Sequence, residues 1–472
     1  MNRNKELLKN TIIIFTGKLC TQLITFVLLP IYTNYLTKTE YGTVDLVITY
    51  INLFSPLLSL QLEYAAFRFL IDKRKDCKGQ NLIISNVMHC LFIIILFTSV
   101  IFIIINGIFN IKYGCLLILI LVFTMLSNMM LQFSRGLGNN LIYSIGSFLA
   151  GSLNAIISIL CIVFLKTDIS GIYLAMIISN FVCFIYIFLK MKIYAKIKYN
   201  LFDKKIVKKL LNYSLPMIPN SICWWIISVS DRTLISTFLG LSYNGIYSVS
   251  SKFSGLIVTV YNMFNLSWTE EISLHIKDSD SNQYISKTFD DIIKIFACGC
   301  VLLIAFIPLV FNILVGNEYR SSYIYIPFLV IGSFFNIIMG MLSAIYIGLK
   351  KSKEMAKSSA LAALINIIIN TIFIKKIGIW AAVLSTVISY MVVSIYRIFD
   401  VKKYINLKLN KITFFHLFLI FSTTIIVYIY DDKLLNILNL IIVLVFSLLY
   451  NKKVLVFIYK SIKEKIKHIR TA

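Results

Sequence analysis

Residues 82–106 read LIISNVMHCLFIIILFTSVIFIIIN, a run of 25 residues without a Lys, Arg, Asp or Glu. A helix needs about 20 apolar residues to cross a bilayer. Runs of this kind recur along the chain and are continuously apolar, whereas strands of membrane barrels alternate. We therefore predict about fourteen spanning helices, near 11–36, 44–69, 82–106, 113–134, 142–165, 170–189, 214–239, 245–266, 291–315, 323–348, 358–374, 378–396, 412–430 and 434–450.

The composition of the whole chain agrees with this prediction. Of 472 residues, 59% are hydrophobic and 14% are charged, and the mean hydropathy is +0.85. Soluble globular chains are about 45–50% apolar and about 25% charged. The apolar excess must face lipid, so the sequence predicts an all-α polytopic membrane protein.

The positive charge has a topological explanation. The 46 Lys and Arg outnumber 21 Asp and Glu, a net charge of +25 that in a soluble protein would suggest nucleic acid. With the N-terminus inside, the inside segments hold 34 Lys and Arg and the outside segments hold 7. Basic residues accumulate on the cytoplasmic side of membrane proteins, so we expect no nucleic acid partner and expect both termini in the cytoplasm.

The sequence offers little to a catalytic or metal site. The four histidines are far apart and lack metal-ligand spacing. The predicted outside loops are short, and the largest extramembrane segments, 190–213 and 267–290, hold no phosphate-binding loop. We therefore expect a transporter without a metal or a cofactor, in which coupling to H⁺ or Na⁺ stays open.

An internal repeat divides the predicted helices into two halves. The phrase LTKTEYG at 36–42 aligns with LGLSYNG at 239–245, and later matches follow in the same order. Six helices per half is an even number, so the repeats are parallel, which is a transporter architecture. The predicted divisions are a first six-helix lobe at 1–189, a basic linker at 190–213, a second lobe at 214–396, two additional helices at 397–450 and a basic tail at 451–472.

Polar and ionisable residues gather in the first two predicted helices of each half. Such residues are rare in membrane helices unless they face a cavity or a partner. The candidates for a cationic cavity are Lys18, Arg68, Arg232 and Lys252, with the acids Asp45, Glu63 and Asp231 and the polar residues Gln22, Asn52, Asn220 and Asn262. Two other interpretations stay open, in which the cations extend to the membrane surface from helix ends or merely pair with the acids.

The phrase LPIYTNYL at 29–36, followed by Glu40, Tyr41, Gly42 and Asp45, resembles the first helical hairpin of bacterial polysaccharide repeat-unit flippases. The phrase QLEYAAFRFL at 61–70 and the central Asp231-Arg232 pair strengthen the likeness. These proteins are the O-antigen and capsule flippases (Wzx type) of the multidrug/oligosaccharidyl-lipid/polysaccharide exporter superfamily, which is MATE-like.

The resemblance implies alternating access by two lobes in the bacterial cytoplasmic membrane. It implies an undecaprenyl-diphosphate-linked oligosaccharide as cargo, membrane lipids as surroundings, and polysaccharide assembly proteins as further partners. The four cations would contact the diphosphate or acidic sugars, and the three acids would be candidates for ion coupling. Three alternatives remain: a multidrug exporter of the same fold, a membrane glycosyltransferase or polymerase of the same pathway, and a scaffold for polysaccharide assembly.

Overall fold

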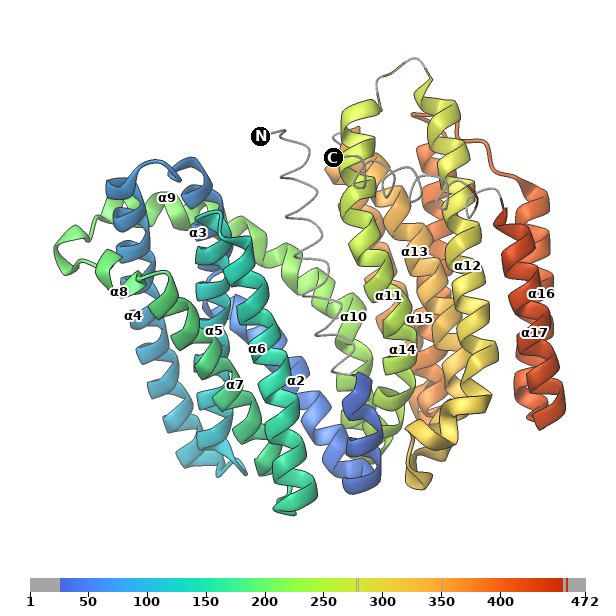
Figure 1. Ribbon diagram of the computed structural model, residues 1–472, viewed down its shortest axis with the longest axis horizontal. Coiled ribbons are helices and arrows are strands. Elements are labelled where there is room, and N and C mark those ends of the chain that lie inside the picture. The colour runs from blue at the N-terminus through green and yellow to red at the C-terminus, as the bar shows by residue number, and fades with distance from the viewer. Residues whose placement is uncertain (1–25, 277, 279, 350, 453–455, 457–472) are drawn as a thin grey trace, which may run out of the picture. The chain divides into compact units, whose positions relative to one another are not determined.

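The structure is a computed structural model that describes residues 26–276, 278, 280–349, 351–452 and 456. Its internal contacts divide the chain into two compact units, Met1–Gly245 and Ile246–Ala472. The described residues form helices and connecting segments, with no strand among them (Figure 1).

The first unit contains nine described α-helices. They are α2 (Lys38–Leu58), α3 (Leu62–Asp72), α4 (Cys77–Phe109), α5 (Gly114–Gly136), α6 (Asn140–Ile159), α7 (Ile169–Lys190), α8 (Ile193–Lys196), α9 (Lys204–Ser214) and α10 (Ile218–Phe238). The helix α11 (Leu241–His275) continues into the second unit, which then comprises α12 (Ser281–Leu314), α13 (Ile326–Gly348), α14 (Ser352–Ile377), α15 (Ile379–Val401), α16 (Lys411–Tyr430) and α17 (Lys433–Tyr450).

The predicted spans correspond to these helices. Among the described residues, eleven helices are long and apolar enough to cross a membrane. The more polar α10 and α11 have 21 and 35 residues and coincide with the predicted spans at 214–239 and 245–266. The first predicted span lies largely outside the described residues. The prediction of an all-α polytopic membrane fold is confirmed.

One predicted span contains a break. The sequence predicts a single helix over 44–69, but α2 ends at Leu58 and α3 begins at Leu62. Leu60 and Gln61 between them have positive φ angles of 53° and 56°, a left-handed conformation that non-glycine residues seldom adopt. Packing maintains the α3 side of this break, because Leu62 of α3 and Phe133 of α5 are both fully buried in one apolar core.

The basic segment 190–213 is packed against the rest of the first unit. The Asn86 amide of α4 donates to the Leu201 carbonyl at 2.8 Å and accepts from the Asp203 backbone amide at 2.7 Å. The Lys196 ammonium bonds the Gln80 amide oxygen at 2.7 Å, and Leu210 of α9 is 1% exposed. These contacts make the segment part of the first compact unit.

The glycines that end the two repeat phrases contact each other's helix. Gly42 is in α2, and Gly245 is in the first turns of α11. A Cβ atom at Gly42 would lie 2.0 Å from the Leu241 carbonyl oxygen, and one at Gly245 would lie 2.2 Å from the Lys38 carbonyl oxygen. The Asn244 amide also donates to the Gly42 carbonyl at 2.8 Å. The repeat phrases therefore form a reciprocal backbone contact that only glycine permits.

Candidate functional site

The helices α2 and α10 pack together in the first unit (Figure 1). They bury an ion pair. The Arg232 Nε atom lies 2.7 Å from Asp45 Oδ2, and the two side chains are 18% and 8% exposed. The neighbouring Asp231 is 3% exposed. The sequence singled out all three residues, and the structure brings Arg232 to Asp45, 187 positions away. Each charge of the pair offsets the other, as one of the open interpretations describes.

Aromatic and polar groups join the same two helices beside the ion pair. The rings of Tyr50 and Trp225 have centroids 6.1 Å apart. The Trp225 indole donates to the Thr49 carbonyl at 3.3 Å, and the Tyr50 hydroxyl lies 3.4 Å from the Thr233 hydroxyl. These bonds satisfy polar groups that would otherwise be costly inside a bilayer.

A small polar pocket continues this interface toward the helix break. Its volume is about 40 Å³, and its walls include Asn52, Pro56, Gln61, Ser221 and Trp225. The Gln61 amide donates to the Ser221 hydroxyl at 2.7 Å, which ties the break to α10. One water occupies about 30 Å³ in the liquid, so the pocket accommodates water and is too small for a sugar ring.

The candidate acid Glu63 lies directly after the break, in the first turn of α3. It is 6% exposed and accepts a hydrogen bond from the Ser59 hydroxyl at 2.6 Å. Because α2 ends at Leu58, Glu63 lies in α3, and the polar residues that the sequence places in the single predicted span 44–69 are divided between two helices.

Among the remaining predicted site residues, Arg68 of the first unit has a different partner from this cluster. Arg68 is half-exposed and pairs with Asp72 of the same helix at 2.6 Å. Lys252 is half-buried and Asn262 is exposed, both on α11 in the second unit. Asn220 lies in α10, but the structure does not describe its side chain. Lys18 and Gln22 lie outside the described residues.

The second unit buries a charge that the sequence analysis missed. Arg397 was predicted to follow the span 378–396, but α15 continues to Val401 and Arg397 is fully buried. Its guanidinium donates to the Ser358 hydroxyl at 2.8 Å, the Met339 carbonyl at 2.9 Å and the Ser359 hydroxyl at 2.8 Å. Further bonds reach the Ser343 hydroxyl and the Met355 carbonyl.

Arg397 therefore joins α13, α14 and α15 through five neutral acceptors. A guanidinium has five N–H donors, and all of them are used. The signal in the sequence was the paired Ser358-Ser359, whose hydroxyls can solvate a buried cation. With its donors occupied by the protein, Arg397 has a structural role.

Outside the membrane spans, one titratable cluster stands at the end of α11. The His275 Nδ1 atom lies 2.7 Å from Asp278 Oδ2. The hydrogen bond with Asp278 raises the pKa of His275 above its ordinary 6.5, and Glu271 adds to the effect.

Comparison with solved structures defines the class of protein to which this fold belongs. The chain resembles lipid II flippase MurJ in an inward closed conformation, with a TM-score of 0.68 and 18% identity over 95% of this chain and 100% of that one. It also resembles an inward-facing multidrug resistance MATE family transporter of the MOP superfamily, with a TM-score of 0.66 and 16% identity over 84% and 99% of the two chains. A MOP superfamily transporter from Pyrococcus furiosus matches with a TM-score of 0.60 and 16% identity over 84% and 94%. The fold is thus that of multi-pass membrane transporters of the MATE and MurJ type.

The family is narrower than the fold. Residues 7–269 match the family model of polysaccharide biosynthesis proteins, and the chain belongs to that family. No curated protein matches the sequence. The resemblance expected from the first helical hairpin is confirmed at the level of family and fold.

Proposed function

We propose that this protein is a flippase that moves undecaprenyl-diphosphate-linked oligosaccharide repeat units across the bacterial cytoplasmic membrane by alternating access. The translocated units would serve the synthesis of O-antigen, capsule or another surface polysaccharide. Membership in the polysaccharide biosynthesis family supports the pathway, and the transporter fold supports translocation without catalysis. Both termini would lie in the cytoplasm.

The observation that carries the proposal is the buried α2–α10 interface. Helices of a lipid-exposed bundle keep Asp45, Arg232, Asp231 and a water-sized polar pocket away from the acyl chains. Intramembrane charges of this kind mark substrate and ion pathways. A glycan head needs such a polar route, whereas a polyprenyl tail can remain in the hydrocarbon.

The cations provide the chemistry that a diphosphate requires. Guanidinium and ammonium groups bind phosphate oxygens through strong charge-assisted hydrogen bonds. We assign substrate contacts to Lys18, Arg68, Arg232 and Lys252, with Gln22, Asn52, Asn220 and Asn262 as polar lining. The acids Asp45, Glu63 and Asp231 are the candidates for coupling to H⁺ or Na⁺. In this proposal Arg232 exchanges Asp45 for the anionic cargo, which couples binding to a rearrangement of α2 against α10.

Transport in reconstituted vesicles tests the function. Purified protein would be inserted into liposomes that carry a polyprenyl-diphosphate oligosaccharide in the inner leaflet, and a membrane-impermeant glycosidase would report its arrival outside. We expect translocation by the wild type, a severe loss with Lys18→Ala or Lys252→Ala, and no loss with the control Lys433→Ala at the exposed start of α17.

The same vesicles separate this function from the MATE-type alternative. An organic cation such as ethidium would be offered in place of the lipid-linked sugar. Export of the cation without movement of the oligosaccharide would overturn the proposal. In cells, a deletion strain should accumulate the lipid-linked intermediate on the cytoplasmic side, and a strain that accumulates none would contradict it.

A further inference from the structure

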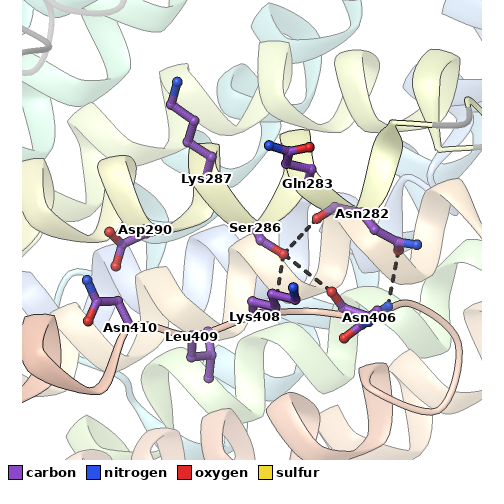
Figure 2. A pocket seen from close by; sticks show the side chains of 9 residues that line it. All are labelled: Asn282, Gln283, Ser286, Lys287, Asp290, Asn406, Lys408, Leu409 and Asn410. Carbon is purple, nitrogen blue, oxygen red and sulfur yellow. Dashed lines mark hydrogen bonds between the residues drawn. The ribbon is translucent and has the colours of Figure 1, made fainter.

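A polar pocket of about 620 Å³ lies in the second unit, apart from the α2–α10 interface. One wall is the beginning of α12, and the other is the segment 406–410 that connects α15 to α16 (Figure 2). The lining residues are Asn282, Gln283, Ser286, Lys287, Asp290, Asn406, Lys408, Leu409 and Asn410.

Hydrogen bonds between the two walls fix the shape of this pocket. The Asn406 backbone amide donates to Asn282 Oδ1 at 3.1 Å, and the Lys408 backbone amide donates to Ser286 Oγ at 3.0 Å. The Ser286 hydroxyl in turn donates to the Asn282 carbonyl at 2.7 Å (Figure 2). The Asn410 side chain caps α16 by accepting from the Ile412 amide at 3.0 Å. Hydrogen bonds from the backbone of the connecting segment therefore hold it along α12. They do not use the side chain of Lys408, which can contact a ligand.

The charge of the pocket is positive. Lys287 and Lys408 are exposed, and neither has an ion-pair partner in the described part of the chain. The single acid, Asp290, is 2.5 Å from Lys294 of the same helix, so its charge is already offset. Lys287 and Lys408 are therefore available to an anionic ligand, and the amide and hydroxyl groups of the lining can bond to it as well. A phosphate ester matches this combination of cations and hydrogen-bonding groups.

The position of the pocket indicates that the phosphate is attached to a lipid. The spanning helix α16 begins at Lys411, directly after the lining residue Asn410. Its side chains Ile412 and Phe415 are 64% and 61% exposed, as expected of residues that meet acyl chains. The distribution of Lys and Arg predicts that this end of the helix is cytoplasmic, where anionic headgroups attract basic residues and basic pockets between membrane helices bind them.

We propose that this pocket binds the phosphate headgroup of an anionic phospholipid of the cytoplasmic leaflet. Lys287 and Lys408 contact the phosphate, and the acyl chains extend along the exposed apolar face of α16. The ligand is a component of the surrounding membrane, so the assignment is independent of the identity of the translocated cargo.

Lipid binding by the full chain in nanodiscs tests the proposal. The double variant Lys287→Gln/Lys408→Gln would be compared with Lys353→Gln/Lys357→Gln, a control with the same loss of charge on exposed lysines of α14 that do not line the pocket. Bound phosphatidylglycerol per protein would be measured by native mass spectrometry against a phosphatidylcholine background. Because Lys287 and Lys408 both contact the phosphate in this proposal and the control lysines do not, removing the pair predicts a loss of about 30-fold in affinity.

Further binding measurements test the role of the charge and distinguish a phospholipid from other ligands that carry phosphate. We expect Lys287→Arg/Lys408→Arg to retain binding, which shows that the positive charge at these two positions, and not the lysine side chain itself, is required. Inorganic phosphate at millimolar concentration should not displace the lipid, because it lacks the acyl chains. An equal loss in the control pair, displacement by inorganic phosphate, or preferential binding of a polyprenyl diphosphate would each overturn the assignment.

Discussion

Replacement of the α2–α10 ion pair tests the candidate site most directly. Asp45→Asn and Arg232→Gln each remove one charge of the pair in an interface where the original side chains are 8% and 18% exposed. Removing one partner of a buried pair costs about 3–5 kcal/mol, because an uncompensated charge remains. The partial exposure of Arg232 places both single variants near 3 kcal/mol. The double variant removes both charges and leaves two amides that can bond each other, so we expect it to cost about 1 kcal/mol or less.

The measurement is a double-mutant cycle of unfolding free energies in mixed micelles, together with translocation in vesicles. Two single losses of about 3 kcal/mol and a double loss near 1 kcal/mol imply a coupling of about 5 kcal/mol, which is large for two side chains in contact. Arg68→Gln is the control, because its ion pair with Asp72 is half-exposed and its loss should leave stability unchanged. A double variant whose loss equals the sum of the single losses would show that the two residues do not interact, and the buried pair would then be refuted. If the double variant is stable but does not transport, Arg232 acts on the cargo as well as on Asp45.

Three further changes test other parts of the structure. Gly42→Ala would place its Cβ 2.0 Å from a backbone oxygen and should destabilise the protein by about 1–3 kcal/mol in the same unfolding measurement. The control Gly107→Ala, with no atom within 4 Å of the new Cβ, should be neutral or stabilising. Equal effects of the two changes would contradict the reciprocal contact. Arg397→Lys retains the charge but offers at most three donors to five acceptors. It should lower the free energy of unfolding by about 2 kcal/mol and increase hydrogen exchange in α14. An unchanged stability would be inconsistent with the structural role of Arg397. The pKa of His275, followed by NMR, should lie above 6.5 and fall toward 6.5 in Asp278→Asn. The contact between His275 and Asp278 stabilises the fold at pH values below the ordinary pKa, and this contribution disappears as the pH rises through the raised pKa. An unchanged His275 pKa in Asp278→Asn would exclude the hydrogen bond as its cause.

The sequence predicts which segments are helical because each crossing of a bilayer needs about 20 apolar residues, although the candidate spans themselves have 18 to 34 residues. The predicted spans 113–134 and 412–430 differ from α5 and α16 by at most two residues at either end. The break at 59–61 could not be predicted, because two non-glycine residues adopt left-handed angles only when tertiary contacts such as the Gln61–Ser221 bond maintain them.

The sequence singles out three buried charged residues of the candidate site but does not give their partners. Ionisable residues are conspicuous in apolar segments of a sequence, and Asp45, Asp231 and Arg232 are recognised for this reason. The sequence suggests Asp231 as the neighbour of Arg232, whereas in the structure Arg232 forms an ion pair with Asp45 on another helix. Arg397 was missed because an arginine at a predicted helix end looks like a residue that reaches the membrane surface. Only the positions of Ser358 and Ser359 across the helix interface reveal its burial.

The separation of Asp45 from Arg232 along the chain has a consequence for biosynthesis. The ribosome adds about 5–20 residues per second, so the 187 residues between them take roughly 10–40 s to produce. During that interval the α2 segment is made before the arginine that Asp45 meets in the folded protein. Until α10 emerges, the interface that it shares with α2 cannot form, and slowed synthesis between these two points should leave α2 more open to proteolysis.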